Sequence, residues 1–139
     1  MIVKDLEKSL NYATEQVHWL AEQIKESKKI GNKQLIEITE KTHEIAYFNT
    51  IIMRAILSAC SNDGVNTLYK TFQLVDEAEL GFGMNSSIAK NIREVIWRMM
   101  LSIRQQDANK FIGTLNETIH LMKDLNAKLT QLINVEAKL

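Results

Sequence analysis

LIEITEKTHEIAYFNTIIMRAILSA, residues 35–59, is the stretch that decides the fold. Its inward-facing positions recur at steps of three and four residues, at Leu35, Ile38, Thr42, Ile45, Asn49, Ile52, Ile56 and Ala59. This spacing is typical of an α-helix that packs one face against a core. No proline interrupts it, and the chain of 139 residues contains none. We therefore predict a long helix capped by Asn32 and ending near Gly64.

The same period predicts four further helices, one before this stretch and three after it. Their expected bounds are Val3 to Ser27, Val65 to Ala78, a cap at Ser86 or Ser87 to Gln106, and a cap at Asp107 to near residue 139. Gly31 is expected to take positive φ in the first turn. Residues 79–85, which hold two glycines, are expected to form a loop. These elements predict an all-α fold, with residues 1–139 as one domain, a five-helix bundle with mostly antiparallel neighbours.

Composition places the chain among ordinary globular proteins. Hydrophobic residues make up 45% and charged residues 24% of it, which suffices for a buried core. No apolar run approaches the roughly 20 residues that span a bilayer, and no signal peptide is visible, so no membrane partner is expected. Cys60 is the only cysteine, so no intrachain disulfide forms and the cytoplasm is the expected compartment. We expect Cys60 itself to be a small core residue.

Each histidine follows a glutamate by three residues, as in ferritin-like metal proteins. The pairs are Glu15 with His18, Glu40 with His43, and Glu117 with His120. A Glu-x-x-His pair holds metal when both side chains point into the bundle. Here the helical spacing turns most of these side chains away from the apolar seams. We therefore expect exposed pairs without metal and no cofactor, while a ferritin-like di-metal protein stays open as an alternative.

The fourth predicted helix carries the main candidate site. Acidic and basic residues balance over the chain, at 17 each, but residues 88–139 hold eight basic and five acidic residues. With Ile88, Ile92 and Val95 inward, the outward side chains give a candidate nucleic-acid-binding set of Lys90, Arg93, Trp97, Arg98 and Arg104. Cations neutralise phosphates and an indole ring stacks on an unpaired base. Alternatively, Trp97 and Leu101 mark a protein contact and the arginines form ordinary ion pairs.

The run WRMMLSIRQQDANKFIGTL, residues 97–115, resembles a stretch near the carboxyl end of the large subunit of type I-B CRISPR Cascade complexes. The matching positions are Arg98, Ile103, Arg104, Asp107, Phe111 and Leu115. The length and helical class of the chain are also similar to those of Cascade small subunits. The resemblance implies a non-catalytic small subunit with a role in antiviral defence. Its implied partners are other Cascade subunits, copies of itself, guide RNA, and target or displaced-strand DNA.

No set of residues predicts a catalytic centre, so we expect no enzyme activity. Three functions follow from the sequence. The first is a Cascade-type small subunit that self-associates and contacts the nucleic-acid backbone. The second is the ferritin-like metal protein. The third is a helical adaptor without nucleic-acid binding, in which Tyr12, Trp19 and Trp97 mark protein contacts.

Overall fold

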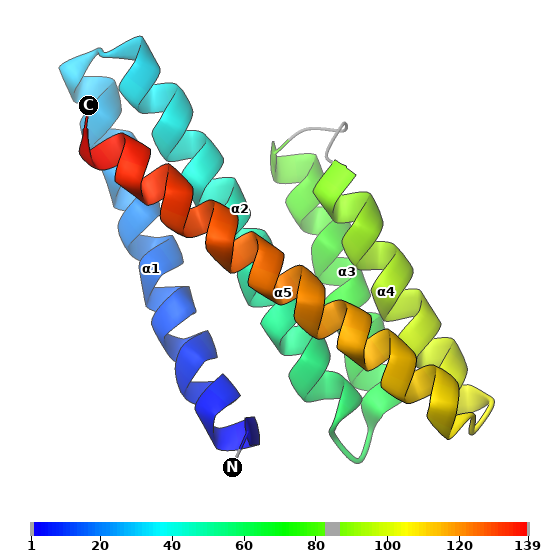
Figure 1. Ribbon diagram of the computed structural model, residues 1–139. Coiled ribbons are helices and arrows are strands. Elements are labelled where there is room, and N and C mark those ends of the chain that lie inside the picture. Colours follow the sequence, from blue (N-terminus) through cyan, green and yellow to red (C-terminus); the bar gives the residue numbers. More distant parts are fainter. Residues whose placement is uncertain (1, 83–86, 139) are drawn as a thin grey trace.

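The computed structural model describes residues 2–82 and 87–138, and within them the chain is all-α. The helices are α1 (Ile2–Ile30), α2 (Lys33–Ala59), α3 (Gly64–Phe82), α4 (Ser87–Arg104) and α5 (Ala108–Ala137). From α1 to α4, each helix runs opposite to the one before it, and α5 runs obliquely to them and packs on α2 and α4 (Figure 1). The predicted five-helix, all-α fold is thus confirmed.

Helix α2 is the centre of the packing. It contacts each of the other four helices, whereas α1 contacts α2 alone within the described residues. The predicted seam is buried from Thr42 to Ala59, whereas Leu35 and Ile38 at its start are only partly buried. Phe48, which was not among the predicted positions, is also completely buried. Helices α3, α4 and α5 add Leu68, Ile92 and Leu125, among others, to the same apolar cluster.

Threonine side chains in the core satisfy their hydroxyl groups within their own helix. Thr42 donates to the carbonyl of Ile38 at 2.6 Å, and Thr118 donates to that of Thr114 at 2.8 Å. A hydroxyl that bonds to the preceding turn costs little to bury. Threonine therefore stands at seam positions without disturbing the apolar core.

The predicted caps are present at both well-defined helix starts. The Asn32 side chain accepts a hydrogen bond from the Leu35 backbone N–H, and that of Asp107 accepts from Lys110. Gly31 has φ +79°, as expected for the residue that ends α1. Of the two predicted caps of α4, Ser87 is the first residue of the helix itself, and residue 86 lies outside the described residues.

Helix α3 is longer than predicted. Residues 79–82 were expected to be loop, but they continue the helix to Phe82, and residues 83–85 lie outside the described part. Two contacts hold this last turn: Ala78 is buried, and the Glu79 carboxylate pairs with Arg93 of α4. Contacts with a neighbouring helix thus outweigh the helix-breaking tendency of Gly81.

The turn between α4 and α5 contains a residue in a strained backbone conformation. Gln106 has φ 53°, in the left-handed region. Its N–H donates to the Ile103 carbonyl at 3.1 Å, and the Asp107 N–H donates to the Ser102 carbonyl at 3.1 Å. These two bonds form a Schellman motif, in which glycine is the usual residue at the left-handed position.

Replacement of Gln106 by glycine should therefore stabilise the protein. The left-handed conformation costs a non-glycine residue about 1–2 kcal/mol, and glycine loses about 0.5–1 kcal/mol more chain entropy, so we expect a gain of about 0.5–1 kcal/mol. Urea unfolding followed by circular dichroism measures it. Gln105→Gly is the matched control and should destabilise; equal effects of the two glycines would contradict the strain argument.

Candidate functional site

Helix α4 divides its residues between the core and an outer face. Its inner side buries Ile92, Ile96 and Met99. On its outer side Lys90, Trp97, Arg98, Leu101 and Arg104 are exposed, and Arg93 is half-buried. The structure therefore brings the five candidate residues to the non-core side of one helix. It differs from the sequence analysis in what each charge contacts.

Arg93 is turned toward α3 rather than toward solvent. Its Nε donates to Asp76 at 2.8 Å, and its terminal nitrogen pairs with Glu79. Only 27% of its side chain is exposed. A guanidinium held by two carboxylates has most of its charge neutralised already. Arg93 thus joins α3 to α4, and a phosphate would have to displace its partners.

Arg98 also has an acidic partner. Its guanidinium lies 2.6 Å from the Glu117 carboxylate on α5, and both side chains are about half exposed. An ion pair at such a site contributes little to stability, about 0–1 kcal/mol, and is screened by salt. Arg98 is therefore more accessible than Arg93, although its charge is balanced locally.

Lys90 and Arg104 are the two candidate cations that form no ion pair within the described residues. They lie near opposite ends of α4. Fourteen residues of helix separate them by about 21 Å. The predicted basic stripe is consequently interrupted, with a cation near each end and neutralised groups between them.

An aromatic and apolar patch lies between Arg93 and Arg104. Trp97 is 54% exposed, Tyr69 of α3 is 53% exposed, and Leu101 is 41% exposed. Together with Met100 and Arg104 these three residues line a shallow hollow of about 210 Å³. We call these five residues the Trp97 patch. A second hollow, of about 420 Å³, adjoins Leu101 on the side of α5 and extends to Lys110 and Glu117.

Tyr69 was missed in the sequence analysis. Its neighbours Leu68 and Thr71 are buried, so the helical period places Tyr69 off the core side of α3. The helical period therefore predicts only that Tyr69 is exposed. Its position at the same hollow as Trp97 depends on how α3 and α4 are rotated against each other, which the sequence pattern does not specify.

The Glu-x-x-His pairs lie on three different helices. Glu15 and His18 of α1 are exposed, and on α5 Glu117 pairs with Arg98. His120, also on α5, is exposed and lies 4.0 Å from Asp124. On α2 Glu40 is exposed, whereas His43 is half-buried. Within the described part of the chain, no three potential ligands are grouped closely enough to hold a metal ion.

Cys60 departs from expectation. It caps the C-terminal end of α2 and is exposed, whereas we expected a small core residue. Its predecessor Ala59 is the last buried residue of the seam, and the chain turns away from the core directly after it.

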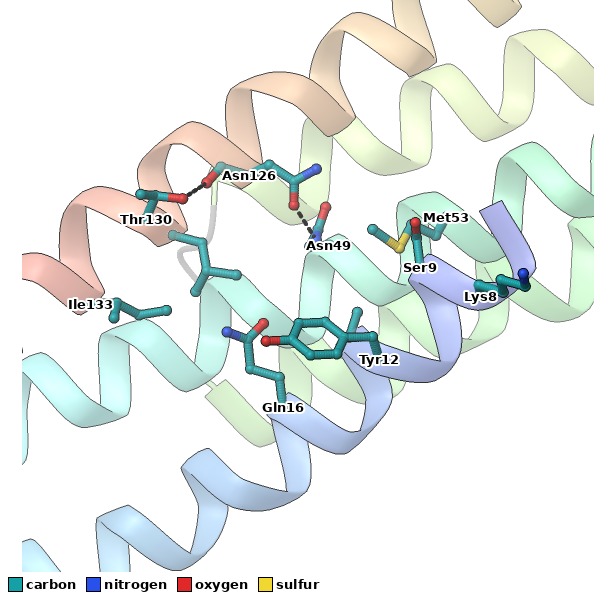
Figure 2. A pocket seen from close by; sticks show the side chains of 11 residues that line it. Lys8, Ser9, Tyr12, Gln16, Asn49, Met53, Asn126, Thr130 and Ile133 are labelled. Carbon is teal, nitrogen blue, oxygen red and sulfur yellow. Dashed lines mark hydrogen bonds between the residues drawn. The ribbon is translucent and has the colours of Figure 1, made fainter. Parts of the chain in front are cut away.

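A larger hollow lies elsewhere, between α1 and α5, and was not foreseen from the sequence. It measures about 580 Å³, and α2 forms its floor. Tyr12 and Gln16 extend into it from α1 (Figure 2). On the floor Asn49 donates to the Asn126 side-chain oxygen at 2.7 Å, as drawn in the same view. The Asn49 oxygen is buried and has no partner among the described residues.

Comparison with known proteins finds no family model, curated protein or solved structure that matches the chain. Within the described residues, no helix combines the length and apolar character needed to cross a membrane.

His43 should make stability depend on pH. Burial lowers its pKa below the ordinary value of 6.5, so the unfolded chain binds this proton at higher pH than the folded chain does. The free energy of unfolding should therefore fall as pH drops below 6.5, by at most about 1.4 kcal/mol per pH unit. Urea unfolding at several pH values measures this slope, which His43→Gln should flatten.

Glu136 has an effect of opposite sign in a lower pH range. Burial raises its pKa above the ordinary value of 4.5, so the folded chain holds that proton more tightly and loses stability as pH rises through this pKa. The His43 comparison is therefore best made in a Glu136→Gln background. An unchanged slope in His43→Gln on that background would refute the assignment.

Proposed function

We propose that this chain is a non-catalytic docking subunit that binds a protein partner through the Trp97 patch. The observation that carries the proposal is the exposure of Trp97, Tyr69 and Leu101 side by side around one hollow. Tryptophan and tyrosine are enriched among the residues that dominate binding energy at protein interfaces. Arg104 adds a hydrogen-bonding group at the rim of the same hollow.

The charges favour a protein over nucleic acid as the partner. Binding to a phosphate backbone draws its energy from cations that are free to replace counterions. Asp76 and Glu79 hold Arg93, and Glu117 holds Arg98. The carboxylates beside the patch would also repel phosphates. Apolar contact with a protein requires no such rearrangement.

A second proposal is the Cascade-type small subunit, a cytoplasmic protein that contacts guide RNA or DNA. It rests on the resemblance of residues 97–115 and on Lys90 and Arg104, whose charges have no partner within the described residues. Trp97 would then stack on a base between the two cations. The two proposals share the patch and differ in the chemistry of the partner.

Affinity purification from the native host tests the first proposal. Trp97→Ala should lose a protein partner that the parent chain retains, because removing a central interface tryptophan commonly costs about 2 kcal/mol or more. Ile112→Ala is the control, since Ile112 is 56% exposed and lies on α5, outside the patch. Quantitative mass spectrometry of the bound proteins, with and without nuclease, gives the readout.

The result is informative in each direction. Retention of every partner by Trp97→Ala would refute docking through the patch. If the partner is lost after nuclease treatment, the nucleic-acid proposal gains support instead. In that case Lys90→Glu combined with Arg104→Glu should weaken the binding of a labelled single-stranded DNA. The slope of log affinity against log salt concentration should also become shallower, by the amount that the loss of about two phosphate contacts gives.

A further inference from the structure

The side of α1 that borders the hollow carries a second seam, which the bundle leaves partly exposed. Ser9, Tyr12, Gln16, Trp19 and Gln23 recur at steps of three and four residues, beside the seam that packs on α2. We call these five residues the α1 stripe. Within the described residues, α2 is the only helix whose Cα atoms come within 8 Å of those of α1. A helix of 29 residues thus packs against a single neighbour.

The stripe is aromatic and uncharged. Tyr12 is 71% exposed and Trp19 is 54% exposed, and the other three positions of the stripe are serine or glutamine. Steps of three and four residues are the spacing with which two helices interdigitate in a coiled coil. Tyr12 and Gln16 also line the hollow above α2, so the stripe continues into a concave surface (Figure 2).

From this surface we infer that α1 pairs with α1 of a second copy of the chain, in antiparallel orientation about a twofold axis. Reversing the order of Ser9, Tyr12, Gln16 and Trp19 reproduces their own spacing when residue n lies opposite residue 28 − n. In this register Gln23 lies opposite Asp5 of the second copy. Trp19 then lies over Ser9 of the second copy, and Tyr12 lies over Gln16 of the second copy. Large side chains meet small or flexible ones, and no charged side chain from the stripe is buried.

Charge complementarity selects this arrangement. Lys8 and Glu22 both precede a stripe residue, on the same flank, and both are exposed. Antiparallel pairing brings Lys8 of each copy toward Glu22 of the other, giving two reciprocal ion pairs. Moving the register by one heptad in one direction would bring Lys8 toward Lys29 of the second copy. In the other direction only Ser9 and Tyr12 of the stripe would still meet the second stripe. Glu22 has an exposed partner at present, Lys25 at 3.3 Å, and such a pair is weak enough to exchange.

The contact area suits a reversible dimer. A large aromatic side chain buries about 150–250 Å² when fully covered, so two tyrosines that are 71% exposed and two tryptophans that are 54% exposed supply on the order of 500 Å². The glutamines, serines and lysine stems add to this area, which stays below the roughly 1,200 Å² of stable interfaces. The dimer should therefore dissociate on dilution.

Sedimentation velocity of the purified full chain tests the inference. We expect the mass to rise from 16.0 kDa toward twice that value with increasing concentration. Trp19→Ala should raise the dissociation constant at least about tenfold, as for a central interface residue. Trp97→Ala should leave it unchanged, which separates this contact from docking through the Trp97 patch. A parent chain that stays monomeric at millimolar concentration would overturn the inference.

Charge variants test the orientation. Lys8→Glu should weaken the dimer, and adding Glu22→Lys to it should restore affinity, because the two charges are exchanged across the interface. Glu15 is also exposed and lies on this flank. Near the twofold axis it approaches Glu15 of the second copy. Glu15→Gln should therefore tighten the dimer by removing a like-charge contact, a gain that misfolding does not produce. Failure of the double variant to recover would exclude the antiparallel register.

Discussion

Burial of α2 by four other helices is the constraint on which the rest of the structure depends. A helix covered on most of its circumference needs apolar or self-satisfied side chains on nearly every side, and residues 45–56 of α2 meet this need with few polar exceptions. The threonines bond to their own helix, and Asn49 bonds to Asn126 across to α5. Hydrophobic burial around this one helix is thus the main source of stability.

The same arrangement determines which surfaces remain open. Helix α2 lies at the centre, so α1 and α5 both pack on it without contacting each other, and a hollow remains between them. Helix α4 packs on α3 and α5 and shows its outer side to solvent. The exposed aromatic side chains collect on these uncovered sides, Tyr12 and Trp19 on α1, and Tyr69 and Trp97 on α3 and α4.

Ion pairs between helices decide which basic residues on α4 keep an unneutralised charge. Five of its outward residues read as one cationic and aromatic stripe, yet acids on α3 and α5 neutralise two of the arginines. An arginine with carboxylates at hydrogen-bond distance serves chiefly to join helices. What remains accessible is an apolar patch with a cation toward each end, which favours contact with a protein.

Periodicity by itself determined the helical class, the inward seams, and the caps at Asn32 and Asp107, because these depend on residues within a few positions of one another. It also identified which side of α4 is exposed. It did not reveal the partners of Arg93, the place of Tyr69 beside Trp97, or the hollow lined by Tyr12 and Asn126. Those features join helices that are distant in sequence, and they depend on the rotation and crossing of each pair. Only the packing of the five helices around α2 decides such contacts.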